Sequence, residues 1–441
     1  MPPVVREQQK PTPSRAAVSP LGRFGFISAV SLAVIIVCGA IFLIGQRMST
    51  VTVDSQNLNS PPSAQAALAQ LRPVRLTLSG ERTISLRVPT NYSITVAADG
   101  FKRLRFMAWS PDHRLFVGEM TSASDTNTGR VVVFDDFDEA AGSFQASHIY
   151  LSGLRNPNSV AFYTDPGGRE WLYVALTDTL LRYPYRHGSI APDTEPQILA
   201  TFPGSGRELM AGGWHLTRTL AFNRDELFVS IGSSCNSCEE KETDRAVIIK
   251  MNADGSNKRV YASGLRNAVG ITFAKGALYA TANESDQLGS DKPNDVVYRV
   301  EDGVNYGWPY CYQYKGTVYK DETTAWQTSY DCSKVPLAFA ELEPHSAPLG
   351  LEYFDNTFTD PALHDSLLVA EHGSGKLSIG TGNRVSLVRR GTSTPFLDGF
   401  LQNGVRQGRA VHILRNDNSS FFVTDDLNGI IYYLKSGSDS V

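Results

Sequence analysis

Six pairs of short β-rich segments recur about 50 residues apart along the 441-residue chain, and this repeat constrains the fold more than any other feature. Each pair consists of an apolar run, a turn and a second apolar run. The first runs are FMAW, SVAFY, TLAF, GITF, LGLEYF and VHIL. The second runs are LFVGE, LYVAL, LFVSI, LYATA, LLVAE and FFVTD, which begin at Leu115, Leu172, Leu227, Leu278, Leu367 and Phe421. The spacing is interrupted once, before Leu367, by an insert that carries NYGWPYCYQY.

The regular period predicts an all-β fold, a six-bladed β-propeller, with one repeat in each blade. No amphipathic helical pattern of about 10 to 15 residues separates the runs, which argues against a parallel sheet built from βαβ units. A β-sandwich and a solenoid are the structural alternatives, and the regular period of paired strands argues against both. We expect residues 92–98 to pair with residues 430–434 of the last blade and so to close the ring.

Cationic side chains recur at one place in these repeats. Counting back twelve residues from the second run leads to Arg266, Arg409, Arg103 (with Arg105 nearby) and His215, and Arg155 precedes its strand in a similar way. A residue that enters the innermost strand of a propeller blade lies near the mouth of the central channel. Converging guanidinium groups repel one another unless an anion lies among them, and their geometry suits carboxylates or phosphates. The repeat therefore predicts a site for a compact polyanion at the channel mouth.

The N-terminal region predicts a membrane anchor. Residues 24–45, FGFISAVSLAVIIVCGAIFLIG, contain no charged side chain and suffice for a helix that crosses the hydrocarbon core. Basic residues precede this run, and Arg47 is the only nearby one after it, so the propeller is expected outside the cytoplasm, in an extracellular or periplasmic location. A cleaved signal peptide is the alternative, but QRMSTV is a poor cleavage site. The predicted segments are a cytoplasmic tail, a signal-anchor, a linker and the propeller, at residues 1–23, 24–45, 46–72 and 73–437.

Cysteine usage is consistent with an exterior domain. Cys38 lies in the apolar run and is expected to be a free thiol, and the other four cysteines form two pairs that are close in sequence. A C-x-x-C pair suggests zinc or thioredoxin chemistry in the cytosol, but there is no second C-x-x-C here and the flanking segments are strand-like. In an oxidising compartment we expect two structural disulfides, Cys235–Cys238 and Cys311–Cys332.

Longer motifs add a family resemblance. The motifs are GGWHLTRTLAF, SIGSSCNSCEEK, MNADGSNKRVYASGLRNAVGITF, VNYGWPYCY, HSAPLGLEYF, LLVAEHGSGK and QGRAV. Through them, residues 91–434 resemble the glucose/sorbosone dehydrogenase family, whose members are six-bladed propellers that use pyrroloquinoline quinone (PQQ), a tricarboxylate, together with calcium. The segments SSCNSCEE and YGWPYCY favour the sorbosone or pyranose dehydrogenase branch over the soluble glucose dehydrogenase branch.

The resemblance implies roles for particular residues. His215 matches the general base that takes a proton from a sugar hydroxyl while hydride leaves that carbon for the quinone. Arg266 and Asn267 match residues that donate hydrogen bonds to the quinone oxygens. The full set of implied cofactor-binding residues is Arg105, Arg266, Asn267, His372 and Arg409.

The resemblance also implies a calcium site in the segment NESDQLGSDKPND. The family binds the cofactor calcium largely through backbone carbonyl groups, which correspond here to Glu284 and Ser285. Three carboxylates in the same segment are oxygen ligands of the type that calcium prefers, namely Asp286, Asp291 and Asp295. The chain departs from the family at Glu284, where relatives usually carry Gly, and at Val411, which replaces a second arginine of the glucose branch.

The predicted function is that of a membrane-anchored PQQ-dependent dehydrogenase that oxidises an aldose, pyranose or related polyol outside the cell. Its expected partners are the sugar, the membrane and an electron acceptor such as a quinone, a dye-like molecule or a cytochrome. The net charge of −4 gives no indication of nucleic-acid binding. A binding propeller that has lost its cofactor is the main alternative. A calcium-dependent lactonase or esterase is a third possibility, and it would require a channel rich in carboxylates.

Overall fold

The computed structural model describes residues 70–204, 214–324 and 329–437. The predicted membrane span at residues 24–45 and Cys38 lie outside these ranges, so the anchor remains a prediction. No helix among the described residues is both long and apolar enough to cross a membrane. Those residues contain only short 3₁₀ helices, which are η1 (Ser79–Glu81), η2 (Glu322–Thr324), η3 (Cys332–Lys334) and η4 (Pro361–Leu363).

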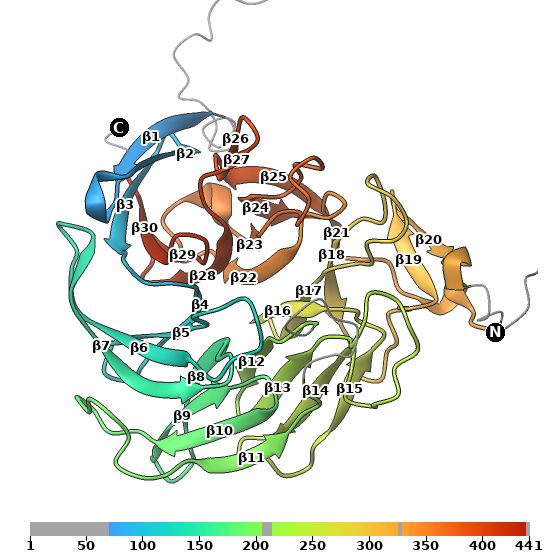
Figure 1. The fold of residues 1–441 in the computed structure, drawn as a ribbon, viewed down its shortest axis with the longest axis horizontal. Coiled ribbons are helices and arrows are strands. Elements are labelled where there is room, and N and C mark those ends of the chain that lie inside the picture. Colours follow the sequence, from blue (N-terminus) through green and yellow to red (C-terminus); the bar gives the residue numbers. More distant parts are fainter. Residues whose placement is uncertain (1–69, 205–213, 325–328, 438–441) are drawn as a thin grey trace, which may run out of the picture. The chain divides into compact units, whose positions relative to one another are not determined.

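Six four-stranded antiparallel sheets surround a common axis and confirm the predicted six-bladed propeller (Figure 1). We number the blades in the chain order of their innermost strands. Blade 1 contains β4 (Leu104–Trp109), β5 (Leu115–Glu119), β6 (Gly129–Asp138) and β7 (Ser143–Leu154). Blade 2 contains β8 (Ser159–Thr164), β9 (Glu170–Ala175), β10 (Thr179–Pro184) and β11 (Gln197–Thr201). Blade 3 contains β12 (Arg218–Asn223), β13 (Glu226–Ile231), β14 (Val247–Asn252) and β15 (Arg259–Ser263).

The remaining three blades follow the same plan. Blade 4 contains β16 (Ala268–Ala274), β17 (Ala277–Ala282), β18 (Val296–Val300) and β21 (Ala340–Glu341). Blade 5 contains β22 (Pro348–Phe354), β23 (Ser366–Glu371), β24 (Arg384–Arg389) and β25 (Thr392–Leu397). Blade 6 contains β28 (Ala410–Arg415), β29 (Ser420–Asp425), β30 (Ile430–Ser436) and β3 (Tyr92–Ala98). The six apolar run pairs of the sequence are thus the first and second strands of the six blades.

Blade 6 closes the ring with strands from both ends of the propeller. Strand β3 pairs antiparallel with β30, with Ile94 opposite Leu434, as the sequence predicts. Each blade packs its apolar face against the next one, and the described residues form six such interblade cores. The second strands are buried along most of their length because they have a blade on either side, which explains their continuous apolar sequence.

An apolar layer lies between four of the six innermost strands. Its four residues come from the innermost strands β4, β16, β22 and β28, and they are Phe106, Val269, Leu349 and Val411. Each of these four strands contains a register shift at that residue, and a β-bulge re-aims a side chain. A Cβ on Gly350 would lie 2.8 Å from the carbonyl oxygen of Val411, so glycine allows β22 to approach β28 closely.

Three hairpins lie outside the blades. The hairpin of β1 (Leu71–Thr77) and β2 (Thr83–Pro89) was not foreseen, and its apolar side chains join the core between blades 5 and 6. The hairpin of β19 (Cys311–Tyr314) and β20 (Thr317–Lys320) belongs to the predicted insert, between β18 and β21. The third hairpin is short and consists of β26 (Leu401–Gln402) and β27 (Val405–Arg406).

Candidate active site

The sequence-predicted cations gather at one end of the propeller. Innermost and second strands pair antiparallel, with Ala268 opposite Ala282 and Ala410 opposite Asp425. Residues that precede an innermost strand therefore lie beside residues that follow the second strand. Arg266 and Arg409 precede β16 and β28 in this way, as predicted. The site is consequently built from the loops at this end of the buried strands.

His215 precedes β12 and is half-buried, with its Nδ1 atom 2.9 Å from the carbonyl oxygen of Ser233. The Ser233 hydroxyl lies 3.0 Å from the same nitrogen but donates its proton to the carbonyl oxygen of Cys235, so it can only accept. These contacts assign the ring proton to Nδ1. The Nε2 atom then carries the lone pair that a general base requires, and it has no hydrogen-bond partner among the described residues.

Electrostatics keep this imidazole neutral. Burial lowers the pKa of His215 well below its ordinary value, and the positive charge of Arg266 lowers it further. The backbone of His215 adopts a left-handed conformation, with φ of 47°. Such backbone strain in a non-glycine residue is more common at functional sites.

Arg266 is only 3% exposed and is held by backbone and amide oxygens. Its Nε and Nη2 atoms donate to the carbonyl and side-chain oxygens of Asn236, at 2.9 Å and 2.8 Å, and Nη1 donates to the carbonyl of Asn283 at 3.1 Å. A guanidinium group has five N–H donors, so two remain for a ligand. Asp286 is the nearest carboxylate, at 3.6 Å, and it is more than half exposed.

Asn267 lies next to His215. A Cβ on Gly232 would lie 2.5 Å from the Asn267 Oδ1 atom and 2.6 Å from the His215 Cβ, so glycine at this position lets the two side chains approach. Asn267 is only 9% exposed, yet its side-chain amide makes no hydrogen bond with the described residues. The structure thus brings His215, Arg266 and Asn267 into one cluster, in which side-chain hydrogen-bonding atoms have no partner among the described residues.

A second cluster surrounds the buried carboxylate of Asp426, which follows β29. Arg103 and Arg105 both donate to its Oδ2 atom, and the Nε2 atom of His372 donates to Oδ1 at 2.7 Å. Burial opposes ionisation of Asp426, but the hydrogen bond from His372 and the charges of Arg105 and Arg103 outweigh it and hold its pKa below the ordinary range. The chain itself therefore supplies one carboxylate to this cluster of arginines.

Arg409 completes this second cluster. It donates from Nε to the carbonyl oxygen of His372 at 2.9 Å and from Nη2 to that of Gly373 at 2.7 Å. Burial lowers the pKa of Arg409 and of Arg105 to about 10, so both remain charged at neutral pH. Burial lowers the pKa of His372 to about 4. Three guanidinium groups thus face one ionised carboxylate, and the cluster keeps a surplus of positive charge.

One asparagine links the two clusters. The Oδ1 atom of Asn158 accepts from the Arg105 Nε at 2.9 Å, and its Nδ2 atom donates to the carbonyl of Arg218 at 3.2 Å. Arg218 in turn donates to the carbonyl of His215 at 2.7 Å. Arg155, in contrast, pairs with Asp125 and Asp178. Arg155 is therefore neutralised by acids of the chain and belongs to neither cluster.

The predicted calcium segment lies beside Arg266, after β17. The backbone carbonyls of Glu284 and Ser285 accept no hydrogen bond from the described residues, and the Glu284 carboxyl group makes neither a hydrogen bond nor an ion pair with them. Burial raises the pKa of Glu284 to about 8, and the neighbouring Asp295 contributes to this shift. These oxygen atoms are available to a hard cation.

The three predicted side-chain ligands do not converge on one point. Asp295 is buried, and it accepts from the backbone N–H groups of Glu284 and Ala347. Asp286 accepts from His345 at 3.0 Å, and Asp291 is exposed. Among the described residues no aspartate triad forms a metal-binding group. Asp295 therefore shapes the loop that presents Glu284, and the three aspartates do not surround a cation.

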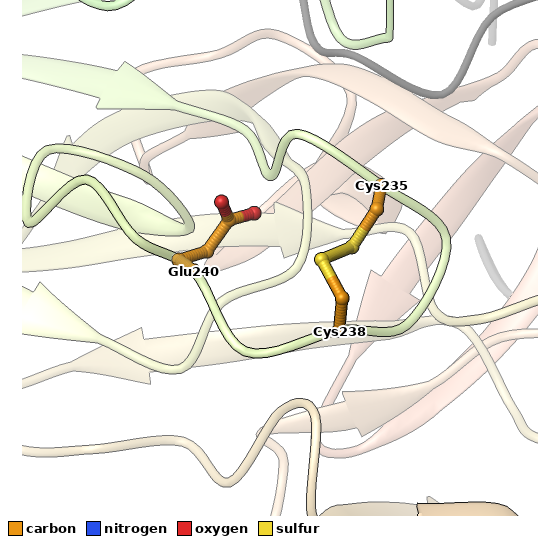
Figure 2. A group of neighbouring side chains, drawn as sticks. All are labelled: Cys235, Cys238 and Glu240. Atoms are coloured by element: carbon orange, nitrogen blue, oxygen red, sulfur yellow. A yellow bond between two sulfur atoms is a disulfide. The ribbon is translucent and has the colours of Figure 1, made fainter.

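Both predicted disulfides are present, Cys235–Cys238 and Cys311–Cys332. Figure 2 shows Glu240 directed toward the first of them. The ligand atoms of these three residues lie within 4.8 Å of one another, as metal ligands do. Sulfur atoms joined in a disulfide are not thiolates, however, and the Glu240 carboxylate accepts from the Ser234 hydroxyl at 2.7 Å. This group is a structural element of the site.

The fold and these clusters define a six-bladed propeller with a polar, cationic site at the mouth of its central channel. A family model described as TrAA12-like matches residues 86–426, more than half of the chain. The chain belongs to this family, which confirms the resemblance inferred from its motifs. An uncharacterised protein of Borreliella burgdorferi is 27% identical over 247 residues, which are 54% of this chain. The match spans 63% of that relative, which is less than two thirds of its length.

Solved structures share the fold at low sequence identity. The holo form of the PQQ domain of pyranose dehydrogenase from Coprinopsis cinerea has a TM-score of 0.65 and 18% identity, and the match covers 82% of this chain and 100% of that chain. A calcium structure of a Trichoderma reesei enzyme of carbohydrate-active family AA12 has a TM-score of 0.64 and 16% identity over 79% and 96% of the two chains. The soluble aldose sugar dehydrogenase of Escherichia coli has a TM-score of 0.55 and 14% identity over 78% and 99%.

Sequence reasoning missed two residues that organise the site. Asp426 follows a second strand, in the same way that Asn283 follows β17, and this repeated place could have identified it. Asn236 lies inside the C-x-x-C loop, where only the cysteines form a recognisable motif. The separation of Asn236 and Arg266 along the chain does not indicate that the two residues touch, because their contact depends on how adjacent blades pack.

Proposed function

We propose that this protein is a PQQ-dependent sugar dehydrogenase anchored to a membrane. The observation that carries the proposal is a neutral His215 with a free Nε2 atom, which stands beside Arg266 and Asn267 at the mouth of a cationic channel. Membership of the TrAA12-like family supports the same function, and so do the names of the PQQ-dependent and sugar-oxidising enzymes that share the fold.

The described residues fit a polyanionic cofactor. Arg103, Arg105 and Arg409 are only partly neutralised by Asp426. Among the described residues, Nη1 of Arg409 meets no acceptor, and one of the two N–H groups on its Nη2 is also unused. Such donors are costly to bury unless a ligand accepts from them. The carboxylates of PQQ would satisfy them, and calcium would be held by the carbonyl oxygens of Glu284 and Ser285 with the Glu284 carboxylate nearby.

Different residues of the chain perform different parts of the reaction. When bound, PQQ supplies the quinone that accepts hydride from the sugar. The Nε2 atom of His215 takes the proton of the sugar hydroxyl, and the resulting imidazolium keeps its Nδ1 proton on the Ser233 carbonyl. Arg266 and Asn267 hold unused donors close to this base and stabilise the negative charge that develops during reduction. The hydrogen bonds from Arg266 to Asn236 and Asn283 keep its donors in place before substrate binds.

The membrane anchor at residues 24–45 is part of the proposal and rests on the charge asymmetry around that run. The two disulfides are consistent with an oxidising location. The electron acceptor is then a species that reaches the channel mouth from outside. A binding propeller without a cofactor remains the alternative function, and a cofactor titration separates the two.

The test is a titration of the full-length apoprotein with PQQ in excess calcium, followed by addition of a series of aldoses and pyranoses. We expect saturable binding, and at least one sugar should change the absorbance of the bound quinone. Arg409→Gln should weaken PQQ binding by about tenfold or more, because it removes a charged donor, whereas Arg390→Gln, in a turn outside the site, should bind like the wild type. Absence of saturable binding would favour the binding-propeller alternative.

A further inference from the structure

A four-residue loop closed by the Cys235–Cys238 disulfide carries Asn236 to the site (Figure 2). The loop is fastened on its N-terminal side, because the Ser233 hydroxyl donates to the Cys235 carbonyl at 2.6 Å. It is also fastened beyond the disulfide, where Glu240 accepts from Ser234. Cys235 is 1% exposed, so the loop begins inside the packed core. The disulfide thus restricts the backbone at Asn236.

Asn236 holds the guanidinium group of Arg266 at two points. Its carbonyl oxygen accepts from Nε at 2.9 Å, and its side-chain oxygen accepts from Nη2 at 2.8 Å. Two parallel hydrogen bonds fix both the position and the plane of a guanidinium group. The third hydrogen bond of Arg266 goes to the carbonyl oxygen of Asn283, which lies on a loop of another blade. This single bond cannot fix the plane of the guanidinium group alone. Asn236 therefore sets the direction in which the remaining Arg266 donors point.

The other polar groups of Asn236 join this loop to neighbouring segments. Its Oδ1 atom also accepts from the Asp286 N–H at 3.0 Å, and its Nδ2 atom donates to the side chain of Gln287 at 3.0 Å. The indole of Trp308 donates to its carbonyl oxygen at 3.3 Å. The same asparagine thereby connects Arg266, the predicted calcium segment and the insert.

We infer that Asn236 is a positioning residue for Arg266 and that the Cys235–Cys238 disulfide holds Asn236 in that role. The inference deepens the proposed function and rests on it for the role of Arg266. Without the disulfide the loop no longer restricts Asn236, and Arg266 loses its orientation.

The Cys311–Cys332 disulfide provides a matched control. It closes the insert, which touches the clamp through the Trp308 indole, but none of the hydrogen bonds of Arg266 itself is made with that insert. Removing it tests for a general effect of losing a disulfide. Arg218 provides an internal reference, since it is fully buried and is held by carbonyl groups outside the C-x-x-C loop.

The experiment compares Cys235→Ala/Cys238→Ala with Cys311→Ala/Cys332→Ala in the full-length protein. Modification by phenylglyoxal, followed by peptide mapping, reports how firmly each arginine is held and requires no cofactor. In the first variant we expect Arg266 to react about tenfold faster relative to Arg218, which is the effect of losing one to two hydrogen bonds to a charged group. PQQ affinity should fall by a similar factor. The second variant should show neither change.

Substitution of Asn236 tests the clamp itself. Asn236→Leu should reproduce the effect of opening the loop, and Asn236→Asp should restore protection of Arg266 because it keeps the acceptor oxygen. The inference would be overturned if Arg266 in the Cys235→Ala/Cys238→Ala variant reacted with phenylglyoxal as slowly as in the wild type. An equal rise in the modification rate of Arg218 would also overturn it. If the wild type binds no PQQ, the proposed function fails, but the modification rates still decide whether Asn236 holds Arg266.

Discussion

A single hydrogen bond determines which nitrogen of His215 can act as a base. The Nδ1 proton is held by Ser233, whose own hydroxyl proton is committed to Cys235. Burial and Arg266 keep the ring neutral at the pH where a histidine of ordinary pKa would be partly charged. The local network thus prepares Nε2 for proton transfer before any substrate arrives.

His215→Gln should separate catalysis from cofactor binding. Glutamine retains a polar side chain of similar reach but cannot accept a proton, so turnover with PQQ and sugar should fall on the order of 10²–10⁴-fold. PQQ affinity should change little, because the cationic cluster is intact. Stopped-flow reduction of the bound quinone measures the first quantity and fluorescence titration measures the second. Equal turnover in His215→Gln and in the exposed control His187→Gln would show that His215 is not the base.

The residue types of the site could be predicted, but their partners could not. His215, Arg266 and Arg409 recur at one offset from a strand, and a periodic offset is visible in the sequence. Asp426 looks like any acid in a turn until the folded ring brings Arg103 and Arg105 to it from the adjacent blade. Contacts between blades depend on packing distances, which a single sequence does not contain.

Among the elements, the bulged inner strands have a particular role. Their bulges direct Phe106, Val269, Leu349 and Val411 toward the axis, where they form an apolar layer below the site. Val411 is fully buried in that layer. This placement explains why valine can stand where the sequence comparison expected an arginine, because the position no longer faces the ligand.

Val411→Arg should therefore destabilise the propeller and should not improve cofactor binding. The substitution buries a charge without a partner and overpacks the layer, which costs several kcal/mol. Urea denaturation should show a free energy of unfolding lower by about 3 kcal/mol or more, while Val411→Ile should lie within about 1.5 kcal/mol of the wild type. A stable Val411→Arg variant with tighter PQQ binding would contradict the assignment of this residue to the apolar layer.

Strands that repeat the common pattern of the blades could be predicted from the sequence. Elements without a counterpart in the other repeats could be predicted less well. The innermost and second strands share composition and period, and β3 was recognisable as the strand that completes the last blade. The β1–β2 hairpin has no counterpart in the other repeats. Its apolar side chains cover the seam between blades 5 and 6, and a cover of this kind has no sequence period to reveal it.

At the scale of the whole molecule, buried histidines couple stability to pH. Burial lowers the pKa of His412 to about 3, and its Nδ1 atom accepts from the Met107 N–H at 3.2 Å. The unfolded chain protonates such a histidine near pH 6.5, whereas the folded chain does not. The stability that the neutral, buried His412 contributes is therefore fully present above about pH 6.5. It is lost as the pH falls below that value toward the folded-state pKa of about 3.

His412→Asn should reduce this pH dependence. Asparagine can keep an acceptor for Met107 but does not protonate, so the slope of unfolding free energy between pH 6.5 and 4 should be smaller by up to about 1.4 kcal/mol per pH unit. The variant should be less stable at pH 7 because it loses the ring contact with Phe106. Denaturant titrations at several pH values give the slope, and an unchanged slope would show that His412 is already charged in the folded state.

The membrane orientation is a separate prediction at the same scale. The apolar run at residues 24–45 and the basic residues before it predict a propeller outside the cytoplasm. Protease added to intact cells or spheroplasts should therefore remove an epitope placed after residue 437, and an epitope at the N-terminus should remain protected. Protection of the C-terminal epitope would reverse the orientation.

A structure of the full-length protein with PQQ and calcium would show whether the channel mouth between the two clusters is the PQQ site. We expect the cofactor carboxylates to lie within hydrogen-bond distance of Arg103, Arg105 or Arg409. We also expect the quinone oxygens to lie beside Arg266 and Asn267, with His215 Nε2 open to the substrate side. A cofactor bound elsewhere, or a bound cofactor that touches none of these arginines, would show that the channel mouth is not the PQQ site.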